Sequence, residues 1–154
     1  MFKKILFCTD FSEDAHWAFT YALNLAETYR SKLIILHVIE FRHYDELLSF
    51  HLSSEELEEL KNSKKKELEK EMETNYIQKM RSLMEYQVLF IEGEPFFEII
   101  QTAKKEAVDL IVMGTHGRTA LDTIIFGSTA DKVVRKSPCP VLTIRLPGRQ
   151  FIMP

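Results

Sequence analysis

The sequence predicts an α/β protein: a single-domain, doubly wound open sheet of five parallel strands with helices on both faces. Five apolar runs alternate with segments of helical periodicity, which is typical of parallel strands joined by helical crossovers. Most of these runs are continuously apolar, as expected of strands covered on both faces. The chain has 154 residues, 45% of them hydrophobic, which suffices for one core without disulfides or a structural metal.

The first strand is predicted at residues 3–9, and a helix follows it. Ser12 is the expected N-cap, with Glu13 and Asp14 in the first turn, where the helix dipole favours negative charge. Apolar residues then recur at helical spacing and form one face: Ala15, Ala18, Phe19, Ala22, Leu25, Ala26 and Tyr29. The alanines on this face would let the helix axis lie close to the sheet.

Residues 33–39 form the second predicted strand, and residues 84–91 give a weaker signal for the third. Gly93 and Glu94 then interrupt the chain, and Pro95 is well placed to open a helix. The apolar positions expected on that helix are Phe96, Ile99, Ile100 and Ala103.

The fourth strand is predicted at residues 109–113 and the fifth at residues 140–146. The fifth alternates, with Leu142, Ile144 and Leu146 on one side, which indicates a strand that is covered less completely. We therefore expect it at an edge of the sheet.

Two segments are less well defined by the sequence. Residues 40–53 have no clear period and could form a short helix, a lid or a partner-contacting loop. Ser53 or Ser54 then caps a long predicted helix that reaches about Leu83. Its stretch at residues 61–71 is almost wholly charged, so we expect a solvated outer face there.

The composition argues against several classes of function. A formal charge of −3, from 20 Lys and Arg against 23 Asp and Glu, argues against a general nucleic-acid binder. No run approaches the ~20 apolar residues that span a membrane. Cys8 and Cys139 show neither metal-ligand spacing nor a disulfide framework, so we expect free thiols in a reducing compartment. These features predict a cytoplasmic protein that binds neither nucleic acid nor membrane.

A ligand is expected at the carboxyl ends of the strands, where the strand order of an open parallel sheet switches. The first strand ends in Thr9 and Asp10. The fourth is followed by Gly114, Thr115, His116, Gly117 and Arg118. Glycines permit backbone angles and a close approach that a Cβ would block, and Arg118 could add donors for an anion.

The helix expected after this segment opens with Gly127, Ser128 and Thr129. A helix N-terminus offers amide donors to an anion, and the two hydroxyls could add to them. The two glycine clusters together predict a phosphate site. Their spacing is neither that of a Walker A loop nor that of the GxGxxG fingerprint.

The spacing Gly114-x2-Gly117-x9-Gly127-Ser128 resembles the G-x2-G-x9-G-[S/T] motif of ATP-binding universal stress proteins. Residues 10–18 also look like the family's first strand–helix junction, and residues 137–142 like its lead into the last strand. The resemblance implies a Rossmann-like domain over residues 1–146 with strand order 3-2-1-4-5, followed by a C-terminal tail at residues 147–154. It also implies a homodimer paired through the fifth strands.

The same resemblance implies which residues would hold an adenine nucleotide. ATP, or another adenylate, would bind with Mg²⁺ held mainly by the phosphates. Asp10 would lie near the adenine or ribose, and because Ser12 can cap the helix, Asp10 is expected to be available for the ligand. The full expected set is Thr9, Asp10, Val38, Met113, Gly114, Thr115, His116, Gly117, Arg118, Gly127, Ser128 and Thr129.

The histidines are weaker candidates for chemistry. His116 could serve as a general base, but no carboxylate lies near it in the sequence to orient it, so a local or phosphate contact is favoured. His37 on a buried strand is expected to be a satisfied core histidine. His43 and His51 lack metal-ligand spacing.

The function expected from the resemblance is a nucleotide-dependent, dimeric stress-response module that binds ATP. One alternative is an ATPase or nucleotide-handling enzyme. Its turnover would be slow, because the sequence offers no P-loop lysine and no paired metal carboxylates. Another is a structural dimer without nucleotide. We assign no catalytic residue and no protein-bound metal site, and we expect at most slow hydrolysis.

Overall fold

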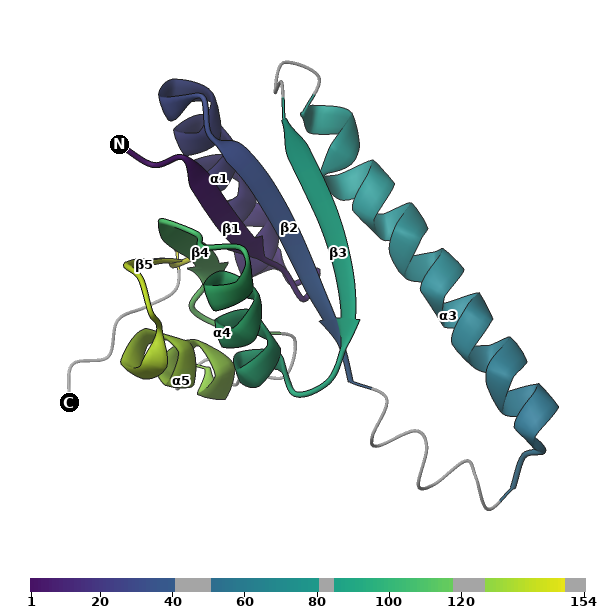
Figure 1. The fold of residues 1–154 in the computed structure, drawn as a ribbon. Helices are drawn as coiled ribbons and strands as arrows, with labels where there is room; N and C mark the ends of the chain where they lie inside the picture. The colour runs from purple at the N-terminus through teal and green to yellow at the C-terminus, as the bar shows by residue number, and fades with distance from the viewer. Residues whose placement is uncertain (41–50, 81–84, 118–126, 149–154) are drawn as a thin grey trace. The chain divides into compact units, whose positions relative to one another are not determined.

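The computed structural model describes residues 1–40, 51–80, 85–117 and 127–148 (Figure 1). It divides into two compact units, one of Met1–Ile39 with Ser82–Pro154 and the other of Glu40–Arg81. Several sequence predictions fall outside the described residues: most of the segment at 40–53, residue 84 at the start of the third strand, Arg118, and the tail from residue 149.

The first unit holds five described strands, all paired in parallel in the order β3-β2-β1-β4-β5. The strands are β1 (Lys4–Cys8), β2 (Lys32–Ile39), β3 (Tyr86–Glu92), β4 (Leu110–Gly114) and β5 (Val141–Ile144). The predicted fold class and strand order are therefore confirmed. As expected from its alternation, the fifth strand lies at an edge of the sheet.

Helices cover both faces of this sheet (Figure 1). Helix α1 (Glu13–Tyr29) lies on one face, and α4 (Pro95–Lys105) and α5 (Ser128–Lys136) lie on the other. Alternate residues of β1 pack into the hydrophobic layers on the two faces of the sheet, because successive side chains of a strand point to opposite faces. Leu6 and Cys8 pack in the cluster with α4 and α5 residues, whereas the Phe7 ring lies 5.3 Å from that of Phe19 on α1.

Helix α1 begins and packs as the sequence predicts. The Ser12 side chain accepts a hydrogen bond from the backbone N–H of Ala15, so Ser12 is the N-cap. Four alanines of the predicted face are buried, which brings the helix close to the sheet: Ala15, Ala18, Ala22 and Ala26. Tyr29, predicted on the same face, is instead 40% exposed at the end of the helix, where its ring meets Phe2.

Helix α4 has Pro95 at its start, as predicted, and buries Ile99, Ile100 and Ala103. At the next strand, Asp109 Oδ2 accepts hydrogen bonds from the backbone N–H groups of Lys3, at 2.7 Å, and Lys4, at 2.9 Å. The Lys4 and Lys3 backbone donors lower the pKa of Asp109, because they stabilise its charged form. This contact fixes the start of β4 beside the start of β1.

The second unit is a long helix, α3 (Ser54–Asn75), followed by a short 3₁₀ turn, η1 (Ile77–Lys79). Ser53 is its N-cap and forms a capping box with Glu56, which settles the choice between Ser53 and Ser54. The prediction that this helix reaches about Leu83 was wrong. Residues with low helix propensity, Thr74 to Ile77, follow the charged Glu/Lys run and end it.

Candidate functional site

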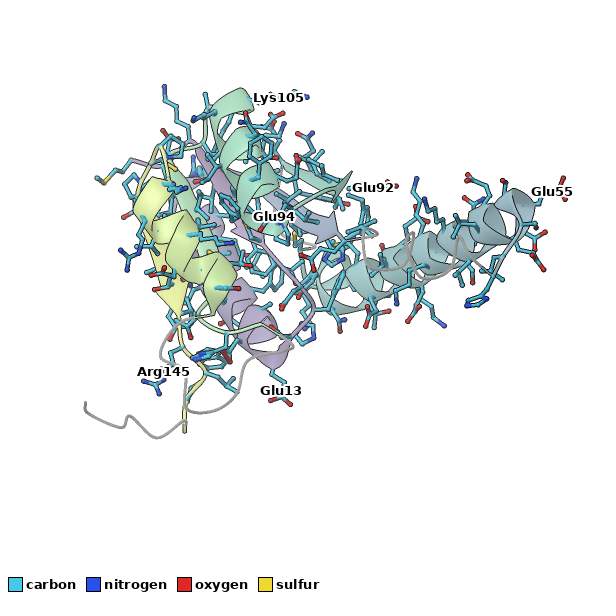
Figure 2. The ribbon with its side chains drawn as sticks, turned by 90° about the horizontal axis from the view of Figure 1, so that it is seen from below. Glu13, Glu55, Glu92, Glu94, Lys105 and Arg145 are labelled. Carbon is cyan, nitrogen blue, oxygen red and sulfur yellow. The ribbon has the colours of Figure 1, made fainter. Side chains whose placement is uncertain are left out.

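Three strands of the first unit end side by side: β2, β1 and β4. The chain leaves β1 for α1 on one face and leaves β4 toward α5 on the other, so the strand order switches between them. Figure 2 views the molecule from this end, with Glu92 at the end of β3, Glu13 at the start of α1 and Arg145 just after β5. An open parallel sheet has its ligand crevice at such a position.

The turn after β1 is held by its own side chains. Asp10 Oδ1 accepts hydrogen bonds from the Ser12 backbone N–H at 3.1 Å and from the Ser12 hydroxyl at 2.6 Å. Ser12 therefore caps α1, as predicted, and also binds Asp10. The hydroxyl also lies 3.4 Å from the backbone oxygen of His116, so it links the turns after β1 and β4.

Thr9 and its neighbours fix the backbone of this turn. Thr9 is 6% exposed, and its hydroxyl accepts a hydrogen bond from the Phe11 N–H at 2.9 Å. Phe11 has a φ of 60°, in the left-handed region, and its ring lies 4.7 Å from that of His37. His37 Nδ1 lies 2.8 Å from the Thr9 carbonyl oxygen, so His37 has the local partner that was expected.

The segment after β4 is buried rather than solvent-exposed. Thr115 is 5% exposed and His116 is 4% exposed. The Thr115 backbone donates to the Ile144 carbonyl of β5 and accepts from the Gly127 N–H at 2.8 Å. This second bond holds the N-cap of α5 directly against the end of β4.

The three motif glycines are needed for close approach and not for unusual backbone angles. None of them has a positive φ; among the described glycines, Gly93 and Gly148 do. A Cβ at Gly114 would lie 3.0 Å from the Asp14 backbone, and one at Gly127 would lie 3.3 Å from the Thr115 oxygen. A Cβ at Gly117 would lie 2.7 Å from Asp10 Oδ2. The expected role in backbone angles was therefore wrong, and the close approach that these glycines allow here is that of other parts of the protein.

The start of α5 presents donors toward this region. Gly127 is the N-cap without a side-chain partner, and the amides of the first turn, from Ser128 onward, have no acceptor inside the helix. A first-turn carboxylate, Asp131, would repel an anion, but Arg135 pairs with both of its oxygens at 2.9 and 3.1 Å. The helix N-terminus thus keeps its positive character.

The remaining predicted site residues contribute less to the cluster. The Met113 side chain is buried in the core with Leu6 and Cys8, so only its backbone can face a ligand. Val38 is half-buried near the end of β2 and packs against the same core. Ser128 is exposed and Thr129 half-buried at the start of α5.

Sequence reasoning missed the partner of His116. Asp14 Oδ1 lies 3.2 Å from His116 Nδ1, and both side chains are almost fully buried. Proximity in the sequence was therefore a poor guide to the partner of His116, since α1 supplies a carboxylate from a distant part of the chain. The signal was available: Asp14 falls on the same helical stripe as Ala18, Ala22 and Ala26, all buried.

The two cysteines are free thiols, and neither has the character of a reactive nucleophile. Burial, and next the nearby Cys139, raise the pKa of the Cys8 thiol. Burial also raises the pKa of Cys139. Within the described residues no three His, Cys, Asp or Glu side chains gather as a metal site, and no helix is long and apolar enough to cross a membrane.

A model of the universal stress protein family matches residues 1–145. The chain belongs to this family. Universal stress protein MJ0577 of Methanocaldococcus jannaschii is 37% identical over 157 aligned positions, which cover 94% of this chain and 96% of the relative. Its solved structure superposes with a TM-score of 0.77 and covers 95% of this chain and 97% of that one.

Other universal stress proteins share the fold. Universal stress protein UspA from Lactobacillus plantarum is 28% identical with a TM-score of 0.72, over 93% of this chain and 97% of that one. Two structures that are each 19% identical were solved with nucleotides. One is a complex with cAMP, with a TM-score of 0.61 over 94% and 97% of the two chains. The other, from Arabidopsis thaliana, has AMP bound, with a TM-score of 0.63 over 95% and 93%.

Proposed function

We propose that this universal stress protein binds an adenine nucleotide, ATP in the first instance, and acts as a nucleotide-dependent dimeric regulatory module. The observation that carries the proposal is the bond from the Gly127 N–H to the Thr115 carbonyl. It holds the N-terminus of α5, whose first-turn amides have no acceptor inside the helix, against the glycine segment after β4. Amide donors at a helix N-terminus suit a phosphate group.

The phosphates would lie against Gly114 to Gly117 and the first turn of α5. Asp10 Oδ2 lies 2.7 Å from the position that a Cβ of Gly117 would take, so this glycine lets the Asp10 carboxylate lie against the phosphate segment. Mg²⁺ would be held mainly by the phosphates themselves, and it would offset their charge near this carboxylate. The donor set of amides and hydroxyls fits a phosphate group.

The adenosine would lie on the side of β1 and β2, against Thr9, Asp10 and Val38. Asp10 is half-buried and held by Ser12, which gives its carboxylate a defined position for a ribose hydroxyl or an adenine amino group. Two relatives of the same fold were solved with AMP and with cAMP, which supports an adenylate as the ligand.

Calorimetry with ATP–Mg²⁺ and GTP–Mg²⁺ tests the proposal. We expect ATP to bind and GTP to bind at least roughly tenfold more weakly, since one well-placed polar contact discriminates by about that factor. Equal affinity for the two, or binding of neither, would contradict it. A continuing heat from turnover after saturation would instead favour the alternative of a nucleotide-hydrolysing enzyme.

Two glycine variants make a matched pair for this experiment. In Gly117→Ala the new Cβ meets the end of the flexible Asp10 side chain, so the fold should survive while Asp10 is displaced and ATP binding is lost. In Gly148→Ala the Cβ meets nothing within 4 Å, although its φ of 87° adds some strain. Normal ATP binding by a folded Gly117→Ala protein would place the ligand elsewhere.

The dimeric part of the proposal is supported by the position of β5. It is an edge strand, and within the described residues no strand pairs with its outer side. An unpaired edge of a parallel sheet is a template for a second copy of the same strand.

A further inference from the structure

Asp14 and His116 form a buried pair that the phosphate chemistry alone does not require. The exposed fractions of their side chains are 1% and 2%, and Asp14 Oδ1 lies 3.2 Å from His116 Nδ1. The Thr115 hydroxyl lies 2.8 Å from the same nitrogen. Two oxygens from different elements, α1 and the segment after β4, thus converge on one ring nitrogen.

This arrangement indicates which nitrogen of the ring carries hydrogen. In a neutral imidazole one nitrogen donates and the other accepts, while a carboxylate can only accept. A lone pair on Nδ1 would face the Asp14 oxygen and repel it, whereas an N–H would be attracted. The first turn of α1, where Asp14 lies, also favours a negatively charged side chain.

The pair meets because Gly114 allows it. A Cβ at Gly114 would lie 2.9 Å from the Asp14 Cβ and 3.1 Å from the Ala15 backbone nitrogen. The first turn of α1 therefore rests directly on the end of β4, and this contact brings the carboxylate to a histidine two residues further along the chain.

We propose that Asp14 is a positioning residue of the nucleotide site: with Thr115 it holds His116 in the Nδ1–H form and in one ring orientation. The consequence for binding rests on the proposed function, because His116 lies between the two glycines of the phosphate segment. The orientation of the His116 ring by Asp14 and Thr115 does not depend on that function.

Nitrogen NMR of the histidine rings at pH 8 tests directly whether the His116 ring is in the Nδ1–H form. Long-range proton–nitrogen spectra of the labelled protein report which ring nitrogen carries hydrogen, and His116→Gln identifies the signals among the five histidines. We expect Nδ1–H for His116 in the unsubstituted protein. An Nε2–H ring there would overturn the proposal.

Two substitutions at Asp14 separate positioning from packing. Asp14→Asn keeps an oxygen acceptor of the same shape and should retain the Nδ1–H form. Asp14→Ala removes the acceptor, so the Nε2–H form should appear. An unchanged Nδ1–H signal in Asp14→Ala would show that Asp14 does not hold the ring. Should that variant not fold, Asp14→Ser, which also takes the carboxylate away from Nδ1, serves the same test.

ATP calorimetry on the same variants tests the consequence for the site. Asp14→Ala should weaken binding by roughly tenfold, because the His116 ring loses the nearby oxygen that orients it, while Asp14→Asn recovers most of the affinity. Equal affinity of all three proteins would contradict a positioning role. If the unsubstituted protein binds no ATP, the proposed function fails, whereas the ring measurement still decides whether Asp14 holds His116.

Discussion

At the turn after β1, Phe11 combines an unfavourable backbone conformation with a favourable buried ring. Its left-handed φ of 60° costs roughly 1–2 kcal/mol for a residue with a Cβ. Its ring is 5% exposed and packs beside His37, and losing such a ring costs about 3–5 kcal/mol. Burial therefore outweighs strain, so phenylalanine remains where glycine would fit the backbone better. The same turn directs the Asp10 carboxylate toward Gly117.

Cys8 gives a residue-level prediction at alkaline pH. Its thiol pKa is raised by burial above the ordinary value of 9.0, so the folded state holds the proton longer than the unfolded state does. The corresponding stability is fully present below pH 9 and is lost as the pH rises above it, by about 1.4 kcal/mol per pH unit for one group. Urea unfolding from pH 8 to 10.5 should show a steeper loss in the unsubstituted protein than in Cys8→Ala.

Cys139→Ala is the matched control for this experiment, because that thiol is only half-buried. Its removal should change the alkaline slope less than removal of Cys8. Parallel slopes for the unsubstituted protein and Cys8→Ala would show that the buried thiol does not contribute.

The individual site residues differ in how far the sequence could predict them. Ser12 was predictable as a cap because the residue type and the following apolar period both mark a helix start. The Asp14–His116 pair was not, because its members are brought together by the sheet order and by Gly114. A polar residue on an otherwise alanine stripe indicated that Asp14 needs a partner, without identifying it.

At the scale of elements, β5 has two distinct edges. The Ile111 N–H donates to the Pro140 carbonyl and the Thr115 N–H to the Ile144 carbonyl. In a parallel ladder, alternate residues face the same neighbour, so Leu142 also faces β4. The N–H of Thr143 therefore faces the outer edge.

Proline at these two positions distinguishes the edges. Thr143→Pro removes an outward donor and should convert the proposed homodimer to a monomer while the fold remains. Leu142→Pro removes a donor of the β4–β5 ladder and should lower the melting temperature. Light scattering and thermal unfolding of both variants check this, and a fully dimeric Thr143→Pro protein would contradict pairing through β5.

The ends of elements were less predictable than their existence. Strand β4 and helix α4 lie where apolar period and Pro95 indicated them. Helix α3 ends at Asn75 although its apolar and charged pattern continues, because low helix propensity decides once the strongly helix-forming run stops. Patterns report which face is buried, and local backbone preference decides where the helix ends.

For the whole molecule, the strand order predicts a gradient of stability. Strand β1 has hydrogen-bonded neighbours on both sides, and Ile5, Leu6 and Phe7 are fully buried. Native-state amide exchange should be slowest in β1 and faster in the edge strands β3 and β5, since local opening needs fewer contacts to break there. Slower exchange across β5 than across β1 would contradict this order. Protection of Thr143 that appears only at high protein concentration would point to pairing between copies.

The architecture was predictable because its signal repeats along the chain. Five apolar runs separated by helical segments permit few arrangements once crossovers are right-handed. The order of the strands was not encoded in any one segment, and it came from the resemblance carried by the glycine spacing. The part of the site formed by the motif glycines Gly114, Gly117 and Gly127 was predictable from their spacing. The contacts between distant segments were not.

The bond between Gly127 and Thr115 has a consequence for the energetics of ligand binding. The backbone N–H of Thr115 donates to Ile144 and its carbonyl accepts from Gly127, so the cap of α5 is joined to the ends of β4 and β5. A ligand that uses the first-turn amides of α5 would therefore meet a helix start that is already fixed, and little of its binding free energy would be spent on ordering that helix.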